Sequence, residues 1–122
     1  RSFSLGIADA VTVLATDAAT ADAAATLIAN AVDADDPAIR RVPARALDPD
    51  SDLGERLVTV AVERLSPTAV EAALAAGAAR ARSFLADGRI LGALIAVQGR
   101  GIVCGPTGPR LANLVTGASL GE

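Results

Sequence analysis

The stretch from Ala8 to Ala31 constrains this chain most, because it places a strand, a turn and a helix in direct succession. Its first half alternates two sets of side chains that are both mostly apolar, which is typical of a strand covered on both faces. Thr16 and Asp17 are residue types that cap helices, so one of them should begin the helix. The alanine-rich second half then has a high intrinsic helix propensity.

Within this helix, Asp22 and Thr26 are four residues apart. Side chains at that spacing project from the same face, one turn apart. A carboxylate and a hydroxyl in this arrangement can share a hard cation such as magnesium, which takes oxygen ligands. Most such pairs on an alanine-rich helix simply belong to its solvated face. Spacing alone therefore favours a solvated face over a metal site.

The composition limits the chemistry that the chain can perform. Its 122 residues fit one domain, 1–122, and 52% of them are hydrophobic although only Phe3 and Phe84 are aromatic. The chain has no histidine and no lysine, which excludes self-contained Ser-His or Cys-His catalysis and a Schiff base. Carboxylates, hydroxyls and arginines remain, and they suit metal and phosphate binding better than nucleophilic catalysis.

Charge and hydropathy limit the partners. A net charge of −3 gives no reason to expect nucleic acid or an anionic membrane as a partner. No segment approaches the ~20 apolar residues of a membrane span, and the start has no signal-peptide pattern, so we expect a cytoplasmic protein. Cys104 is the single cysteine, which excludes an intrachain disulfide and predicts a buried, inert thiol.

Three polar residues near the start are secondary ligand-binding candidates. Ser2 and Ser4 would share a face of an extended segment, where they either touch a ligand phosphate or ribose or simply face water. Asp9 is the only charged residue between Ser2 and Thr16. If the strand is covered on both faces, the Asp9 carboxylate must be hydrogen-bonded or near a cation.

The region from Ala31 to Gly54 breaks the pattern and is predicted to be a long loop. The acidic run DPDSDLG superficially resembles part of an EF-hand, but it lacks the glycine and the closing glutamate of that loop. We therefore expect it to be solvated. Arg40, Arg41 and Arg45 either reach a ligand phosphate or pair with nearby acids at the surface.

The remaining chain predicts one strand, one long helix and a hairpin. Arg56 to Leu65 is a strand with its valines toward the core. A helix follows from Pro67 to about Ala86, and Ile90 to Val97 begins a hairpin that turns at Gln98 to Gly101. Residues 106–122 read as a tail.

Three residues define the long helix in more detail. Ser66 is its expected N-cap, and Gly88 is its expected C′ residue. Gly77 lies in its middle and permits close approach to a sheet. Together, these elements predict an α+β fold with a largely antiparallel sheet and helices packed on one face.

Several segments resemble a known family. The run VTVLATDAATADAAATLIANA resembles the late motif of the FAD:protein FMN transferase family, ApbE. The start RSFSLGIADAVTVLA, the region RRVPARALDPDSDLGERLVTV and the hairpin GALIAVQGRGIVCG are similar to an uncharacterised sister family allied to ApbE. The resemblance implies a T-fold-like (ApbE-like) architecture, of which this chain would be the C-terminal part.

The resemblance also implies cofactors and ligands. In ApbE, the helix Asp and Thr bind the Mg²⁺ that holds the flavin pyrophosphate, so those roles fall on Asp22 and Thr26, with the backbone carbonyl of Ala25 as a further ligand. The implied function is that of a flavin-related, magnesium-dependent protein that uses FAD or FMN. In ApbE, the FMN part of FAD is transferred to a Ser or Thr of a target protein.

Catalysis by this chain alone is not expected, because neither a full ligand shell nor a base is visible. The expected partner is an N-terminal half, another chain or a second copy in a homodimer. The alternative function is a non-enzymatic module that binds a nucleotide or flavin, or one that completes a partner's sheet.

Overall fold

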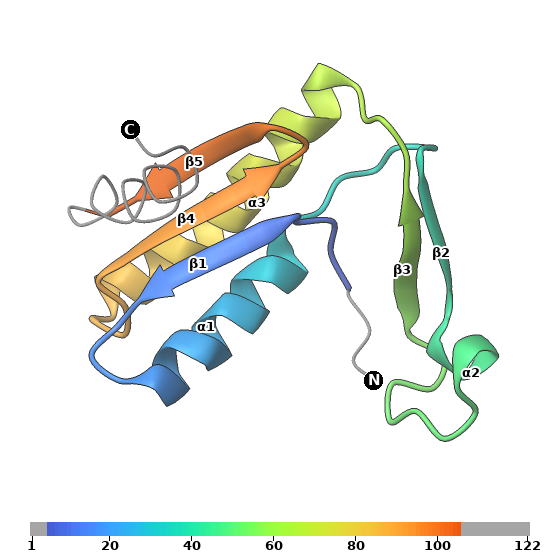
Figure 1. Cartoon of the computed structure of the whole chain (residues 1–122), viewed down its shortest axis with the longest axis horizontal. Helices are drawn as coiled ribbons and strands as arrows, with labels where there is room; N and C mark the ends of the chain where they lie inside the picture. The colour runs from blue at the N-terminus through green and yellow to red at the C-terminus, as the bar shows by residue number, and fades with distance from the viewer. Residues whose placement is uncertain (1–4, 106–122) are drawn as a thin grey trace, which may run out of the picture.

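Strand β1 (Ala10–Leu14) and helix α1 (Ala18–Ala31) follow one another as the sequence predicts (Figure 1). The structure is a computed structural model that describes residues 5–105. Asp17 is the N-cap of α1, and its carboxylate accepts the Thr20 backbone N–H at 2.8 Å and the Thr20 hydroxyl at 2.9 Å. This cap satisfies a backbone donor that the first turn of a helix otherwise leaves without a partner.

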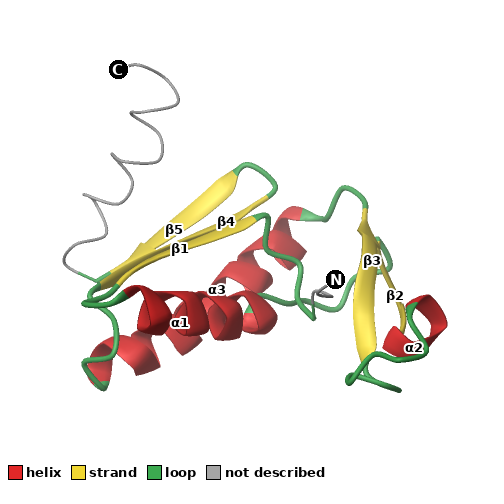
Figure 2. Ribbon diagram, turned by 60° about the horizontal axis from the view of Figure 1, so that its bottom comes forward, coloured by secondary structure: helices red, strands yellow, loops and turns green. Residues whose placement is uncertain are grey.

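The predicted C-terminal hairpin is confirmed and completes a three-stranded antiparallel sheet. Strand β4 (Gly92–Val97) lies between β1 and β5 (Arg100–Cys104). Val11 is paired with Ile95, and Ile95 with Ile102, so these three side chains share one face. Helices α1 and α3 (Pro67–Ala86) cover that face only, as Figure 2 shows.

The main core lies between this sheet face and the two helices. Its residues are small and aliphatic, with Phe84 as the one buried aromatic in the described range. The largest fully buried side chains in this cluster are Ile28, Val32, Ile95 and Val97. A core of this kind depends on closely packed elements, because alanine contributes little side-chain area of its own.

The outer face of the same sheet carries no charged side chain. By register it consists of Ala10, Thr12 and Leu14 on β1, Leu94 and Ala96 on β4, and Val103 on β5. The sequence predicts a β1 covered on both faces, whereas no helix or strand of residues 5–105 lies on this one. An antiparallel sheet with one solvated face usually has polar residues there.

The prediction of a long loop from Ala31 to Gly54 is wrong. Residues Ile39–Pro43 form strand β2, and Ala44–Leu47 form a short helix α2. Strand β2 is antiparallel to β3 (Leu57–Val62), the strand that the valine pattern predicts. The arginines and the proline of β2 do not follow the alternation of apolar and polar residues by which a strand is identified. A register shift after Arg40 interrupts this alternation further.

The β2–β3 hairpin is a sheet of its own and is not bonded to the other three strands. Val58 and Ala44 are fully buried, but they lie outside the main core cluster. Ile39 and Val62, at the other end of the hairpin, do pack against the main core. The hairpin is therefore anchored at one end and has a small core of its own at the other.

The details predicted for α3 are confirmed. The Ser66 hydroxyl accepts the Ala69 backbone N–H at 3.1 Å, and Pro67 occupies the first turn. Gly88 follows the helix end with a φ of 72°, a left-handed conformation that glycine adopts at low cost. A Cβ on Gly77 would lie 2.4 Å from Val32 Cγ2, so the absence of a side chain lets α3 approach closely.

The observed fold is thus α+β with antiparallel sheets and helices, as expected. The predicted tail at 106–122 lies outside the described residues.

Candidate functional site

Helix α1 presents Asp22 and Thr26 on its exposed side, one turn apart. The Thr26 hydroxyl donates to the Asp22 backbone carbonyl at 3.1 Å, which fixes the hydroxyl near the helix surface. Both side chains are accessible to a ligand. Within residues 5–105, no three His, Cys, Asp or Glu side chains lie together as a complete metal-binding group.

The Ala25 carbonyl lies in the second turn of α1. In a regular helix this oxygen accepts the N–H of residue 29, so it offers a metal only its second lone pair. The described part of the chain therefore provides at most one carboxylate, one hydroxyl and one shared carbonyl here.

Asp9 has a backbone partner that is distant in sequence. Its carboxylate accepts the backbone N–H of Gln98 at 2.5 Å, and its own N–H donates to the Ala96 carbonyl at 2.9 Å. The side chain is exposed rather than covered. Ser2 and Ser4 lie outside the described residues, which begin at Leu5.

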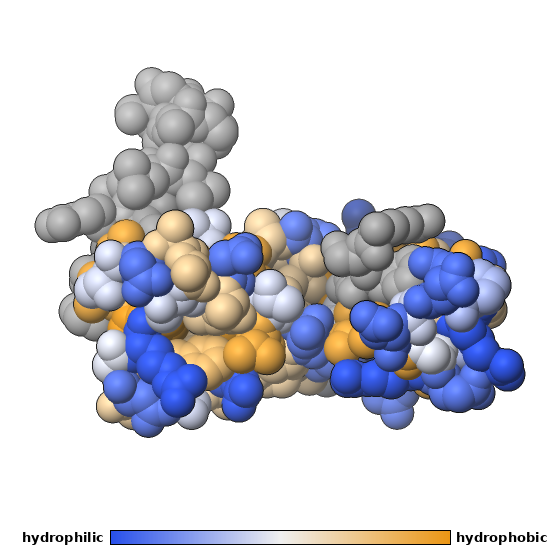
Figure 3. All heavy atoms as spheres, turned by 90° about the horizontal axis from the view of Figure 1, so that it is seen from below, coloured by the Kyte–Doolittle hydropathy of each residue, from blue (hydrophilic) through white to orange (hydrophobic). Residues whose placement is uncertain are grey.

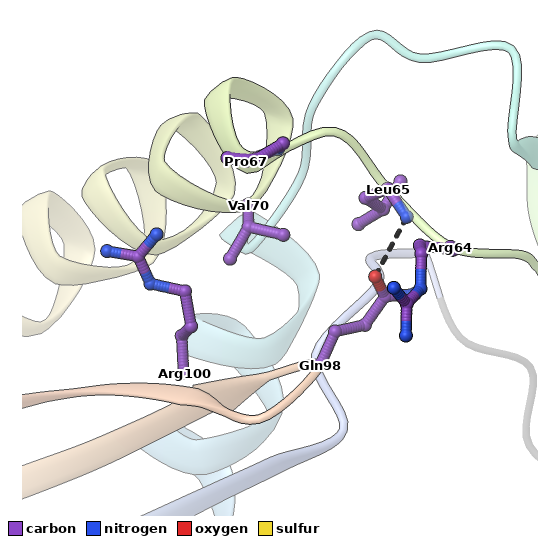
Figure 4. Close-up of a pocket in the computed structure, with 6 residues that line it drawn as sticks. All are labelled: Arg64, Leu65, Pro67, Val70, Gln98 and Arg100. Atoms are coloured by element: carbon purple, nitrogen blue, oxygen red, sulfur yellow. Dashed lines mark hydrogen bonds between the residues drawn. The ribbon is translucent and has the colours of Figure 1, made fainter.

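Gln98 holds the hairpin turn to the β3–α3 connection through its side-chain amide, and Figure 4 shows the bond to Leu65. The amide oxygen accepts the Leu65 N–H at 2.8 Å, and the amide nitrogen donates to the Glu63 carbonyl at 2.7 Å. Gln98 has a φ of 46°, which is uncommon for a residue with a side chain. The hairpin turn is thus bonded to the β3–α3 connection and, through Asp9, to the segment before β1.

A cleft of about 520 Å³ lies beside Gln98, lined also by Arg64, Leu65, Pro67, Val70 and Arg100. Figure 4 shows Arg64 and Arg100 on opposite sides of it. Arg100 is ion-paired with Glu71 at 2.7 Å, and the Gln98 amide is occupied by backbone groups. Most of the polar groups here already have partners within the protein, which favours a structural junction.

A second cleft, of about 580 Å³, lies between α1, α3 and the β2–β3 hairpin. We call it the arginine cleft; it is lined by Leu5, Leu27, Asn30, Ala31, Asp33, Arg41, Arg56, Leu57 and Arg80. Among residues 5–105, it brings together three arginines from three separate elements or connections and one carboxylate. The sequence identifies Arg41 as a candidate phosphate contact but does not identify Arg56 or Arg80, because only the tertiary fold brings the three together.

Cys104 is buried in β5, as predicted. Burial raises the pKa of its thiol, while the positive charge of Arg82 acts in the opposite direction. Because the thiolate is the reactive form, a raised pKa makes this cysteine a poor nucleophile.

One family model matches this chain, over residues 1–103, and its description is AbpE bacteria. The chain belongs to the AbpE bacteria family. No curated protein and no solved structure matches it. The part that matches AbpE bacteria contains all of α1, with Asp22 and Thr26, and every lining residue of the arginine cleft.

None of the helices that the structure describes in this AbpE bacteria chain is both long enough and apolar enough to span a membrane. The longest, α3, has 20 residues, but it carries Glu71, Arg80 and Arg82 among its alanines.

Proposed function

We propose that this AbpE bacteria chain is part of a flavin-related, magnesium-dependent protein of the ApbE superfamily. The observation that carries the proposal is the exposed Asp22–Thr26 pair on α1, in a chain that matches the family model over residues 1–103. The similarity of the names AbpE and ApbE, and the resemblance of α1 to the ApbE helix motif, support the same assignment. We place the protein in the cytoplasm.

The donor set fits magnesium in part. Magnesium in proteins is usually bound through one or two carboxylates together with substrate phosphates, and it keeps several waters. Asp22 would supply the carboxylate, and Thr26 would supply a hydroxyl oxygen that keeps a free lone pair while it donates to the Asp22 carbonyl. Magnesium would offset the charge of a pyrophosphate when both are bound.

In the reaction proposed for the complete protein, a Ser or Thr hydroxyl oxygen of a target protein forms a bond to the phosphorus of the FMN half of FAD. The P–O–P bond breaks, AMP leaves, and the hydroxyl proton passes to a base. The chain has no histidine or lysine to act as this base, so we assign to this chain the binding of the ligand and not the whole reaction.

A titration of FAD, monitored by flavin fluorescence with and without magnesium, tests this proposal. We expect magnesium-dependent binding that Asp22→Ala weakens at least tenfold. Asp52→Ala is the matched control, because Asp52 is an exposed carboxylate on the loop before β3, away from α1. A longer gene product that contains this chain should be titrated in parallel.

Binding by the longer product but not by this chain would place the rest of the site outside the 122 residues. Failure of both to bind FAD would refute the flavin assignment. Equal binding by Asp22→Ala and by the unchanged protein would refute the role of the α1 pair.

The second candidate function is a structural module that completes a partner's sheet. The uncharged outer face of β1–β4–β5 favours it, since such a face is normally covered. β1 and β5 are both edge strands of their sheet, and β1 has no charged or proline residue to block pairing. A protein with this function would bind no FAD, with or without magnesium.

A further inference from the structure

We propose that the arginine cleft is a binding site for a phosphate-bearing anion, with Arg56 and Arg80 as its main donors. This site is separate from the Asp22–Thr26 pair and does not require magnesium. This inference goes beyond the proposed function, because the anion site does not depend on flavin binding.

The charge of the cleft is the first argument. The chain as a whole has a net charge of −3, yet the described residues that line this cleft include three arginines and a single carboxylate. Asp33 is already ion-paired with Arg41. Within residues 5–105, neither Arg56 nor Arg80 forms an ion pair, and the Arg80 guanidinium lies over the ring of Phe84. Two positive charges of the cleft therefore have no carboxylate partner among the described residues.

The way in which two of the arginines are held is the second argument. The Arg80 guanidinium lies 4.8 Å from the centroid of the Phe84 ring, an interaction that orients its plane. Arg41 is fixed by Asp33 and by a contact of 3.5 Å with the Thr59 hydroxyl. Arginine side chains that are already ordered lose less conformational entropy when they bind, and their planar fork matches two phosphate oxygens.

The remaining lining suggests what else the ligand carries. Leu27 is 44% exposed and Leu57 is 57% exposed, so apolar surface lies beside the charges of the cleft. Asn30, in the last turn of α1, adds an amide that can donate and accept. This mixture suits a ligand with a phosphate group and an apolar or planar part.

The position of the cleft supports a binding role. Its lining residues come from α1, α3, the β2–β3 hairpin and the segments that flank them. Figure 1 shows the hairpin to one side of the two helices. Seen from below, the surface over the hairpin is mainly hydrophilic, whereas the helical part shows a hydrophobic area (Figure 3). Ligand-binding sites are usually concave, and this cleft lies between separately packed parts of the fold.

Asn30 also relates the cleft to the other site. Asp22, Thr26 and Asn30 follow one another at four-residue intervals on α1. The rise from Thr26 to Asn30 is about 6 Å along the axis, and that from Asp22 to Asn30 is about 12 Å. The two sites are thus close on one helix but do not share a residue, and they can be tested separately.

The probes are inorganic phosphate and pyrophosphate, titrated into the full 122-residue chain by calorimetry in magnesium-free buffer. We expect binding in the millimolar range or tighter, with pyrophosphate bound more tightly than phosphate. Arg56→Ala and Arg80→Ala should each weaken pyrophosphate binding about fivefold to tenfold, by loss of a charge-assisted contact. Affinity should also fall as salt is added.

Two matched controls separate this site from a general attraction of anions to arginine. Arg45→Ala removes an arginine from the same hairpin region. Arg45 pairs with Glu55 and does not line the cleft. Arg82→Ala removes one from α3, two residues from Arg80 and not in the cleft. Both should change pyrophosphate binding less than twofold.

Asp22→Ala distinguishes this proposal from the previous one, because it should leave magnesium-free pyrophosphate binding unchanged. No detectable binding of pyrophosphate by the folded chain would overturn the proposal. An equal loss in all four arginine variants would also overturn it, since that result indicates non-specific attraction. Circular dichroism of each variant shows whether it is folded.

Discussion

The Asp9 carboxylate accepts the backbone N–H of Gln98, 89 residues later in the chain, at 2.5 Å. This bond joins the segment before β1 to the turn between β4 and β5. The same turn is held from its other side by the bonds of the Gln98 amide to Glu63 and Leu65. A single turn therefore ties together the start, the middle and the end of the described chain.

Asp9→Ala should lower the free energy of unfolding by about 1 kcal/mol, because it removes a charged acceptor from a backbone donor at an exposed site. Asp9→Asn keeps an acceptor oxygen and should lose less. Urea unfolding followed by circular dichroism measures both. Asp22→Ala, at an exposed site, should change stability by less than about 0.5 kcal/mol, and a comparable loss there would contradict the role given to Asp9.

Gln98 combines a costly backbone conformation with two useful side-chain bonds. Gln98→Ala loses both bonds and keeps the positive φ, so it should be destabilised by about 2 kcal/mol. Gln98→Gly loses the same bonds but adopts the conformation freely, and should be more stable than Gln98→Ala by roughly 1 kcal/mol. Equal stability of the two variants in urea would show that the turn does not hold this φ in solution.

Gly77→Ala tests the close approach of α3 to the connection after α1. Helix propensity alone predicts stabilisation by about 1 kcal/mol. The added methyl would overlap Val32 and crowd Ile95, and overpacking of this kind costs about 1 to 3 kcal/mol. We therefore expect a net loss in thermal or urea unfolding, whereas Ala79→Gly, on the exposed side of α3, should lose about 1 kcal/mol.

A double-mutant cycle isolates this contact. Val32→Ala alone should be destabilising because it leaves a cavity in the main core. In the double variant, the methyl group introduced by Gly77→Ala occupies part of that space, so the combined loss should be smaller than the sum of the two single losses. Strict additivity would mean that the two positions are not in contact.

Asp17 should make the stability of α1 depend on acid pH. The backbone N–H of Thr20, followed by the Thr20 hydroxyl, lowers the pKa of the Asp17 carboxyl below its usual value of 3.8. The contribution of the charged cap is therefore complete above 3.8 and is lost as pH falls from that value through the lower, folded-state pKa. Asp17→Asn keeps a capping oxygen without the titration.

The measurement is the difference in unfolding free energy between the unchanged protein and Asp17→Asn across the acid range. We expect this difference to be constant above the usual pKa and to move in favour of Asp17→Asn as pH falls below it. Parallel curves for the two proteins through the whole range would contradict a lowered pKa at Asp17.

The sequence predicts those elements whose signals are local. Asp17 and Ser66 are caps that act within three residues, and β4 lies within a continuous apolar run that ends at a glycine-containing turn. The sequence therefore predicts these elements correctly. Strand β2 was missed because Arg40, Arg41 and Pro43 carry no apolar alternation. Its pairing with β3 is a long-range property that the local sequence does not encode.

Of the two candidate sites, one can be predicted from the local sequence and the other cannot. The spacing of Asp22 and Thr26 is visible in the sequence, because a helix converts it directly into proximity. Arg56 and Arg80 are 24 residues apart in the chain, and they line one cleft only through the tertiary arrangement of the segment before β3 and helix α3. No local pattern of residues could have paired them.

The separate anchoring of the β2–β3 hairpin has a consequence for how the fold opens. Amide protons of β2 and β3 can exchange with solvent through a local unfolding that leaves β1, β4 and β5 intact, because the two sheets share no strand-to-strand bonds. An anion held in the arginine cleft would contact both parts at once. It would thereby convert two independently opening units into one cooperative unit, and the slowing of exchange would be concentrated in the hairpin.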